Sequence, residues 1–379
     1  MKKKLVAVAV AGVLGAPLAA HAQTANVTLY GRLNVDLEWV KGAQPDGSNP
    51  NVTRLSSNSS RFGIRGTESL GGGLNAIFQI ESSINGDTNS GNLGGRETFV
   101  GFQGAWGTFK MGHFLMPLDD MHPIFGNVPT FTTSILATAA LWANNGGFAK
   151  GTGAFDDRLS NSLRYDTPNI SGFTGSAQIS LCGTGGSACG VGDAENGATD
   201  AYVASVAGIY NNGPFQGGIA FERNDEVRGI GLKDWAATVT VAWNFGVVRV
   251  AGLYERLQYD TPTGDLKRNL WGISATAPVG PGTVYASWQR ANDGKGSCTS
   301  RVGGVTCGGD TGSDHYTVSY TYPLSKRTIT YVGYSGINNE ARASYNYNIN
   351  PYTAASAGVT ALPTGIDLNG FVAGVVHLF

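Results

Sequence analysis

The stretch Val27-Thr28-Leu29-Tyr30-Gly31-Arg32-Leu33-Asn34-Val35-Asp36-Leu37-Glu38-Trp39 alternates between two kinds of side chain. Its odd-numbered positions carry valine, leucine, glycine and tryptophan, whereas its even-numbered positions are polar or charged. A repeat of two residues places successive side chains on opposite faces of a β-strand. The stretch therefore predicts a long strand with one apolar face and one polar face.

The same alternation recurs in residues 234–245 and 315–322, where tryptophan, tyrosine and valine occupy every second position. A soluble β-sandwich needs an apolar inner face. Here the polar faces include arginine, aspartate and glutamate, so we expect the apolar faces to contact lipid and the polar faces to line a wet lumen. Aromatic residues at the strand ends are typical of a lipid–water interface.

The turn signals set the number of strands. Seven short segments are rich in Gly, Pro, Asn or Ser, as tight turns require, and lie at 69–73, 105–108, 168–172, 211–214, 244–247, 278–282 and 323–326. Eight longer stretches alternate with them, at 40–52, 85–95, 115–157, 183–198, 224–233, 259–267, 293–312 and 338–365. This arrangement predicts an all-β fold, a 16-stranded antiparallel transmembrane β-barrel wide enough to hold water.

The composition agrees with a wall that faces lipid. Only 14% of the 379 residues are charged, against about 25% in an ordinary soluble protein. The formal net charge is −1 and 41% of residues are hydrophobic, which excludes a disordered chain and gives no basic excess for binding nucleic acid. The 56 glycines show no triplet period, which excludes collagen.

Residues 1–22 have the pattern of a secretory signal peptide. Lys2, Lys3 and Lys4 precede an apolar run, and Ala20-His21-Ala22 is a small-residue cleavage site. We therefore expect the barrel to comprise residues 23–379 after export.

Export to an oxidising compartment favours disulfide bonds between the four cysteines, Cys182, Cys189, Cys298 and Cys307. Three pairings are possible. The local ones, Cys182–Cys189 and Cys298–Cys307, each close a short glycine-rich segment and are the favoured prediction. A metal site is the rival interpretation, although the spacings fit no zinc pattern.

The stretch 115–157 is much longer than its neighbours, and a loop of that length needs a function. Its middle, residues 133–144, predicts a short helix with Ser134 as the N-cap. An exposed, mobile loop is the alternative. The apolar side chains favour burial against the barrel wall, which would narrow the lumen: Phe131, Ile135, Leu136, Leu141, Trp142 and Phe148.

Several motifs resemble one family over essentially the whole mature chain. They are Val27–Gly31, Ser60–Glu68 followed by Leu70–Ala76, Gly95–Phe102, and the terminal His377-Leu378-Phe379. Together they resemble the Gram-negative general diffusion porins, most closely the beta-proteobacterial (Burkholderia/Neisseria-like) porins. The resemblance implies an outer-membrane homotrimer without a cofactor, with the third long loop folded into each pore and Phe379 as an assembly signal.

The resemblance also implies which residues line the pore. The family's basic cluster maps onto Arg32, Arg61, Arg96 and Arg158, and Arg65 and Lys110 are further wall cations. Opposing carboxylates are expected from the ends of the long loop: Asp119, Asp120, Asp156 and Asp157. The family's acidic loop motif is not clearly present, because residues 149–153 occupy much of that region. Weak anion preference is the prediction, although the net charge acts against it.

These patterns predict a passive channel for ions and small hydrophilic solutes. The resemblance implies the partners, which are further copies of this chain, outer-membrane lipid and lipopolysaccharide. A substrate-specific channel or an adhesive surface barrel is the alternative. An enzyme is not expected, because the mature histidines lie far apart in sequence and no G-x-S-x-G motif is present. No metal-ligand cluster is evident either.

Overall fold

A computed structural model describes residues 26–43, 49–142, 154–182, 201–298, 302, 306–353 and 362–379. The predicted signal peptide, Phe148 and Cys189 lie outside these residues. Within them, no helix is both long and apolar enough to cross a bilayer.

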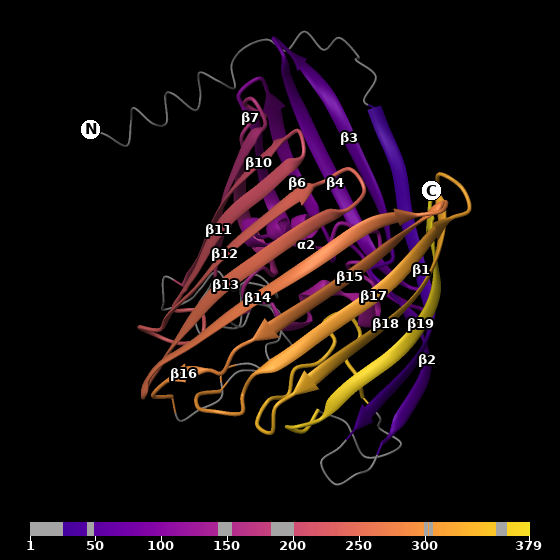
Figure 1. The fold of residues 1–379 in the computed structure, drawn as a ribbon. Coiled ribbons are helices and arrows are strands. Elements are labelled where there is room, and N and C mark those ends of the chain that lie inside the picture. The colour runs from indigo at the N-terminus through magenta and orange to yellow at the C-terminus, as the bar shows by residue number, and fades with distance from the viewer. Residues whose placement is uncertain are drawn as a thin grey trace.

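The strands form one antiparallel sheet that closes on itself (Figure 1). Closure occurs at β1, which pairs with β19 on one side and with β2 and β3 on the other. The wall strands are β1 (Asn26–Ala43), β2 (Asn51–Ser57), β3 (Arg61–Gly71), β4 (Leu74–Asn85), β6 (Thr98–Gly104), β7 (Gly107–Leu115), β8 (Arg158–Asp166), β9 (Phe173–Leu181), β10 (Tyr202–Asn212), β11 (Phe215–Asp225), β12 (Lys233–Asn244), β13 (Arg249–Thr261), β14 (Gly264–Val279), β15 (Gly282–Ala291), β17 (Ser313–Pro323), β18 (Thr328–Asn339) and β19 (Asp367–Leu378).

The predicted 16-stranded barrel is confirmed. β2 and β3 are two halves of one wall strand, since both pair with β1 and only residues 58–60 separate them. Two short strands, β5 (Ser90–Asn92) and β16 (Lys295–Gly296), pair with β4 and β14 at the long-connection end. An even number of wall strands places the start of β1 and the end of β19 at the end of the barrel that carries the short turns.

All seven predicted short turns join neighbouring wall strands, but one predicted long loop is wrong. Residues 259–267 belong to a hairpin in which only Pro262 and Thr263 separate β13 from β14. The side chains of Tyr259 and Leu266 are buried on its inner face. Charged residues interrupt the alternation here because the hairpin projects beyond the rest of the wall, at the lower left of Figure 1.

Burial along β1 is inverted relative to a soluble protein. Leu29, Leu33 and Trp39 are 59%, 40% and 44% exposed on the outer face. Arg32, Asn34 and Glu38 are only 8%, 0% and 0% exposed on the inner face. Lipid tolerates the first group and not the second, so the apolar face is the outer face, as predicted.

Aromatic side chains form two rings on the outer surface. In β12, Trp235 and Trp243 lie on the same face, eight residues apart. That spacing is about 27 Å along a strand, or about 21 Å across a membrane for a tilt near 40°. Trp235 stacks on Phe221 towards the long loops, and Trp243 contacts Phe215 near the short turns. The span between the rings is close to the ~25 Å apolar band of such barrels.

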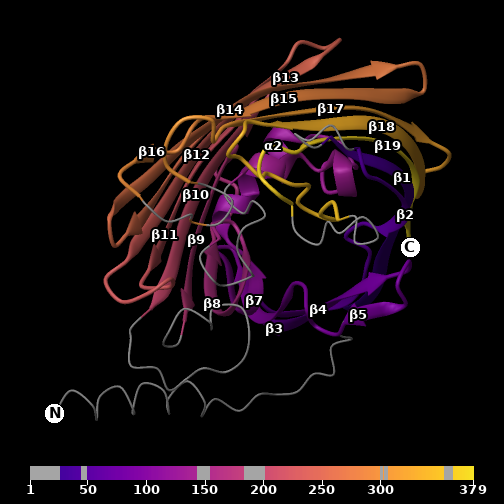
Figure 2. The same cartoon turned by 90° about the horizontal axis from the view of Figure 1, so that it is seen from below.

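The connection between β7 and β8 is called loop three below, and its described residues from 116 to 142 run inside the barrel (Figure 2). It contains η1 (Pro117–Met121), α2 (His122–Phe125), η2 (Ser134–Leu136) and η3 (Thr138–Leu141). Burial of Ile135, Leu136, Leu141 and Trp142 is confirmed, whereas Phe131 is only half-buried.

The single helix predicted over 133–144 is wrong for its described part, residues 133–142. Ala137 is extended, with ψ 125°, and separates two short 3-10 turns. Ser134 is not an N-cap, because it lies inside the first of these turns with φ +35°. Apolar contact with the curved wall, rather than regular helix hydrogen bonding, determines this path.

Buried hydrogen bonds attach loop three to the far wall. The Trp142 indole N–H donates to Gln289 Oε1 at 2.8 Å, and Gln289 Nε2 donates to the Thr138 carbonyl at 2.7 Å. The Ser274 hydroxyl donates to the Phe125 carbonyl at 2.7 Å. These bonds hold the loop against β14 and β15.

The connection between β18 and β19 also turns inward, crossing the ring in yellow in Figure 2. Tyr345, Tyr347 and Tyr352 are fully buried. Arg54 Nη2 donates to the Asn350 carbonyl at 2.7 Å, and Arg268 Nη1 donates to the Tyr345 hydroxyl at 3.2 Å. The sequence indicated only a long loop here, so its inward path is a finding of the structure.

Candidate pore constriction

A cavity of about 740 Å³ lies between loop three and the wall formed by β1, β3 and β8. All four arginines of the predicted basic cluster line it: Arg32, Arg61, Arg96 and Arg158. Asn348, Ile349 and Pro351 of the β18–β19 connection also line it. The two inward-folded connections and the basic wall therefore meet at one narrow place.

Register explains how two of these arginines meet. Arg32 in β1 lies directly opposite Arg61 in β3, and like charges in that position are destabilising. Arg61 Nε lies 3.6 Å from Glu81 Oε2 in β4. The neighbouring strand therefore partly compensates this pair of cations.

Glu81 is the main acidic partner of the basic wall, and the sequence patterns did not predict it. Its Oε1 lies 2.6 Å from Arg96 Nε, and its Oε2 accepts a hydrogen bond from the Tyr30 hydroxyl at 2.9 Å. Its register position opposite Gly63 places it beside the arginines. Only the pairing of the strands brings Glu81 next to Arg61 and Arg96, and this pairing is the signal that could have identified it.

Glu97 is a second acidic wall residue that the sequence patterns did not predict. Its Oε1 lies 3.8 Å from Arg158 Nη2 and accepts the Leu115 N–H at 3.2 Å. It directly follows Arg96, inside a motif already recognised.

Arg32 differs from its neighbours because it contacts loop three rather than an acid. Its Nη2 donates to the Pro129 carbonyl at 3.1 Å, and its Nη1 donates to Thr132 Oγ1 at 3.4 Å. Among the described residues it forms no ion pair with a carboxylate. Its charge is therefore the least neutralised of the four.

The predicted loop acids divide into two groups. Asp119, Asp156 and Asp157 line the cavity. Asp120 does not, because its Oδ2 lies 2.8 Å from Arg164 Nη2 at the wall. Loop three thus supplies three of the four expected carboxylates.

His122 links these acids, which the sequence did not predict. Its Nε2 lies 3.0 Å from Asp156 Oδ2 and its Nδ1 lies 3.4 Å from Asp119 Oδ1. Burial acts against its charge, but the carboxylates of Asp156 and Asp119 outweigh burial and raise the pKa of His122 to about 9. Burial raises the pKa of Asp156 to about 7. At neutral pH loop three therefore carries an additional cation.

Two predicted wall cations lie away from this cavity. The Arg65 guanidinium lies 5.0 Å from the centre of the Tyr30 ring and lines an adjoining cavity of about 410 Å³, which shares Arg32, Arg61 and Glu81 with the first. The Lys110 ammonium lies 2.9 Å from Asp166 Oδ2.

The C-terminal residue lies on the seam where the barrel closes. Gly31 N–H donates to the Phe379 carbonyl at 3.0 Å, and Phe379 N–H donates to the Gly31 carbonyl at 3.1 Å. The Phe379 ring covers Gly31, where any Cβ would collide with it.

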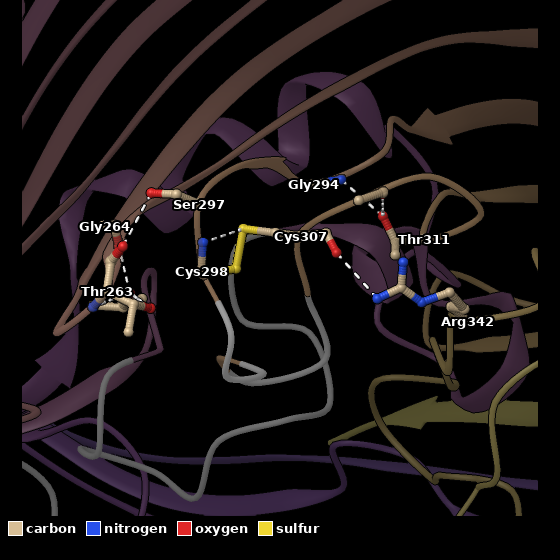
Figure 3. The surroundings of a disulfide bond; sticks show 10 residues. Thr263, Gly264, Gly294, Ser297, Cys298, Cys307, Thr311 and Arg342 are labelled. Carbon is tan, nitrogen blue, oxygen red and sulfur yellow. Dashed lines mark hydrogen bonds between the residues drawn. A yellow bond between two sulfur atoms is a disulfide. The ribbon is translucent and has the colours of Figure 1, made fainter.

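One of the two favoured disulfides is confirmed. Cys298 and Cys307 are bonded to each other, as Figure 3 shows. The predicted Cys182–Cys189 bond stays a prediction, because Cys189 lies outside the described residues.

A protein-family model described as "Gram-negative porin" matches residues 6–342. The chain belongs to this family. It is an outer-membrane porin, a non-enzymatic channel for the diffusion of small solutes, and the resemblance noted in the sequence is confirmed.

Individual comparisons agree with this membership. The porin is 28% identical over 387 residues to outer membrane porin protein 32 of Delftia acidovorans, with both chains fully covered. The solved anion-selective porin from Comamonas acidovorans matches with a TM-score of 0.71 at 24% identity, covering 94% of this chain and all of that one. The trimer form of OmpT from Vibrio cholerae matches with a TM-score of 0.64 at 14% identity, covering 94% and 100%. At these identities the two structures show the shared fold.

Proposed function

We propose that the cavity between loop three and the arginine wall is the constriction of this porin. The observation that carries the proposal is the placement of four arginines on the wall with Asp119 and Asp157 on the facing loop. Water and small hydrophilic solutes would pass between them.

Opposed charges in a narrow opening create a transverse field. Walls of low dielectric focus that field. A polar solute aligns with it, whereas an apolar solute cannot replace the ordered water around the charges. The constriction would therefore favour ions and polar molecules without binding one substrate. Apart from the imidazole of His122, Phe131 is the only aromatic side chain among the described residues that line the cavity, which gives little support to an aromatic path for a specific substrate.

Weak anion preference follows from how these charges are paired. Glu81 contacts two arginines, and Asp156 is buried against His122. Arg32 has no carboxylate partner among the described residues. The name of the Comamonas relative records anion selectivity in that porin, which is consistent with the same sign here.

The assembly we propose is a homotrimer in the outer membrane, with lipopolysaccharide as a lipid partner. Residues 1–22 would direct export, and Phe379 would serve as the assembly signal. The trimer form of the Vibrio cholerae relative supports the oligomeric state. Phe379 pairs with Gly31 at the seam of the barrel, so its hydrogen bonds form only when the barrel has closed.

The reversal potential across a planar bilayer with a KCl gradient tests the constriction. Arg32→Gln should lower the anion-to-cation permeability ratio by about twofold or more, because it removes the least neutralised cation. Arg327→Gln is the matched control, since it removes an exposed arginine that lines neither this cavity nor the adjoining one. Unchanged selectivity in Arg32→Gln, or an equal change in the control, would disprove the proposed site.

A further inference from the structure

Another basic pocket lies on the outer surface of the barrel, away from the pore. It has a volume of about 220 Å³ and is formed by β13, β14 and the segment around β16. Its lining comprises Arg256, Lys267, Asn269, Asn292, Asp293 and Lys295. The constriction uses none of these residues.

Alternation along the strands places the pocket on the lipid side. Glu255 and Arg268 are buried on the inner face and pair with each other at 3.0 Å. Arg256 directly follows Glu255 and Lys267 directly precedes Arg268, so the side chains of Arg256 and Lys267 point outward.

The pocket lies beside the aromatic ring nearer the long loops. Tyr254 is two residues before Arg256, about 7 Å along the strand, and lies opposite Trp271. Trp271 and Trp288 contact each other with ring centres 4.6 Å apart. Belts of aromatic residues around such a barrel lie at the lipid–water interface. The pocket therefore lies at the level of the polar headgroups of the outer leaflet.

The charges in the pocket are only partly compensated. Lys267 in β14 lies directly opposite Lys295 in β16, an arrangement that is destabilising without an anion. Lys267 Nζ lies 3.1 Å from Asp265 Oδ2 at the surface. Arg256 and Lys295 form no ion pair with any described residue. Three cations therefore face one small volume.

The single carboxylate in the lining is already engaged. Asp293 Oδ1 accepts the N–H groups of Thr311 and Gly312 at 2.9 and 3.0 Å. Asn292 Oδ1, in contrast, is buried without a hydrogen-bond partner among the described residues. The pocket thus offers positive charge beside a buried acceptor that has no partner among the described residues.

The segment that carries Lys295 is cross-linked on both sides, by the hydrogen bonds and the disulfide drawn in Figure 3. Cys298 is bonded to Cys307, and the Ser297 hydroxyl donates to the Thr263 carbonyl at 3.0 Å. Gly294 N–H donates to Thr311 Oγ1 at 2.9 Å. These bonds fix both ends of the short segment that carries Lys295, so its backbone stays paired with that of Lys267.

We propose that this pocket binds the phosphate of a phosphorylated glycolipid in the outer leaflet. The guanidinium of Arg256 would meet two phosphate oxygens, and the lysines would add point charges. Asn292 Oδ1 would accept a hydrogen bond from a sugar hydroxyl. This proposal rests on the proposed function, which includes lipopolysaccharide as a partner, and it adds the place on the barrel where that lipid binds.

The test measures binding of bisphosphorylated lipid A to the full-length porin in detergent micelles. The double variant Lys267→Gln/Lys295→Gln should bind it on the order of thirty-fold more weakly than the wild type, since each lysine near an anionic headgroup contributes about 1 kcal/mol. Lys233→Gln/Lys326→Gln is the matched control, because it removes the same charge from exposed positions outside the pocket. The control should bind like the wild type.

Two competition measurements distinguish a lipid headgroup from a soluble anion. Lipid A without phosphates should bind all variants equally weakly. Millimolar inorganic phosphate should not displace lipid A, and displacement would show a site for soluble anions instead. Equal binding by the pocket variant and the wild type would overturn the proposal. Ion conductance of the same samples reports the channel separately, so loss of lipid binding with normal conductance leaves the pore proposal intact.

Discussion

At the residue scale, the constriction depends on which acid partners each arginine. The four arginines were predictable, because each lies on a polar strand face or in a recognised motif. Glu81 and Glu97 were not predicted, since their roles depend on the register between strands, and alternation within one strand does not determine that register. The bridging role of His122 depends on the path of loop three, which the sequence does not specify.

The His122 cluster predicts that selectivity depends on pH. Its pKa is raised to about 9 from the ordinary 6.5, so the imidazolium persists through neutral pH and is lost as the pH rises through 9. Since Asp156 has its pKa raised to about 7, both partners are charged between about pH 7 and 9. Reversal potentials from pH 7.5 to 10 should show the anion preference falling.

The variant His122→Gln is the control for this pH dependence. It lacks the titrating imidazole, so its selectivity should stay nearly constant over the same range. A wild-type curve that is equally flat would show that His122 does not act on the permeating ions.

At the element scale, the strands and short turns were predictable, whereas the paths of the loops were not. Alternation and turn residues are local signals, and they located the seven tight turns at the short-turn end of the barrel. The inward path of loop three followed from its apolar composition, but its 3-10 turns depend on contacts with distant strands. The β13–β14 hairpin was misread as a loop because its charged residues lie beyond the apolar band, where alternation no longer distinguishes a lipid face from a water face.

Gln289 predicts how firmly loop three is held. Gln289→Leu would leave the buried Trp142 N–H and the Thr138 carbonyl without partners, a cost of about 1–3 kcal/mol for each group. Single-channel recordings should then show larger current noise or a changed open conductance, because the loop moves from the wall. Gln103→Leu, which changes an exposed glutamine beside a short turn, should leave the recordings unchanged. If the current noise and open conductance of Gln289→Leu equal those of the wild type, Gln289 does not hold loop three in place.

At the scale of the whole molecule, the fold depends on two solvents, lipid outside the barrel wall and water inside it. Lipid contacts the apolar outer band, and water and the inward loops contact the polar inner face. The scarcity of charge and the even number of strands both follow from this arrangement, and both were visible in the sequence. The fold of the barrel is therefore the best-predicted feature of the chain.

A lysine in the outer band tests this arrangement. Val239 lies on the lipid face in the middle of β12, so Val239→Lys should lower the free energy of unfolding by about 2–4 kcal/mol. Val247→Lys, in an exposed short turn, should change it by less than about 0.5 kcal/mol. Denaturant titration in lipid vesicles gives both values, and equal effects would contradict the assigned lipid face.

Single-channel conductance in a planar bilayer tests the central claim most directly. A water-filled pore narrowed by loop three predicts ohmic current steps in groups of three that grow with KCl concentration and that sugars do not block. Absence of steps would contradict the channel itself. Steps that saturate with salt, or that a sugar blocks, would contradict passive diffusion through the proposed constriction.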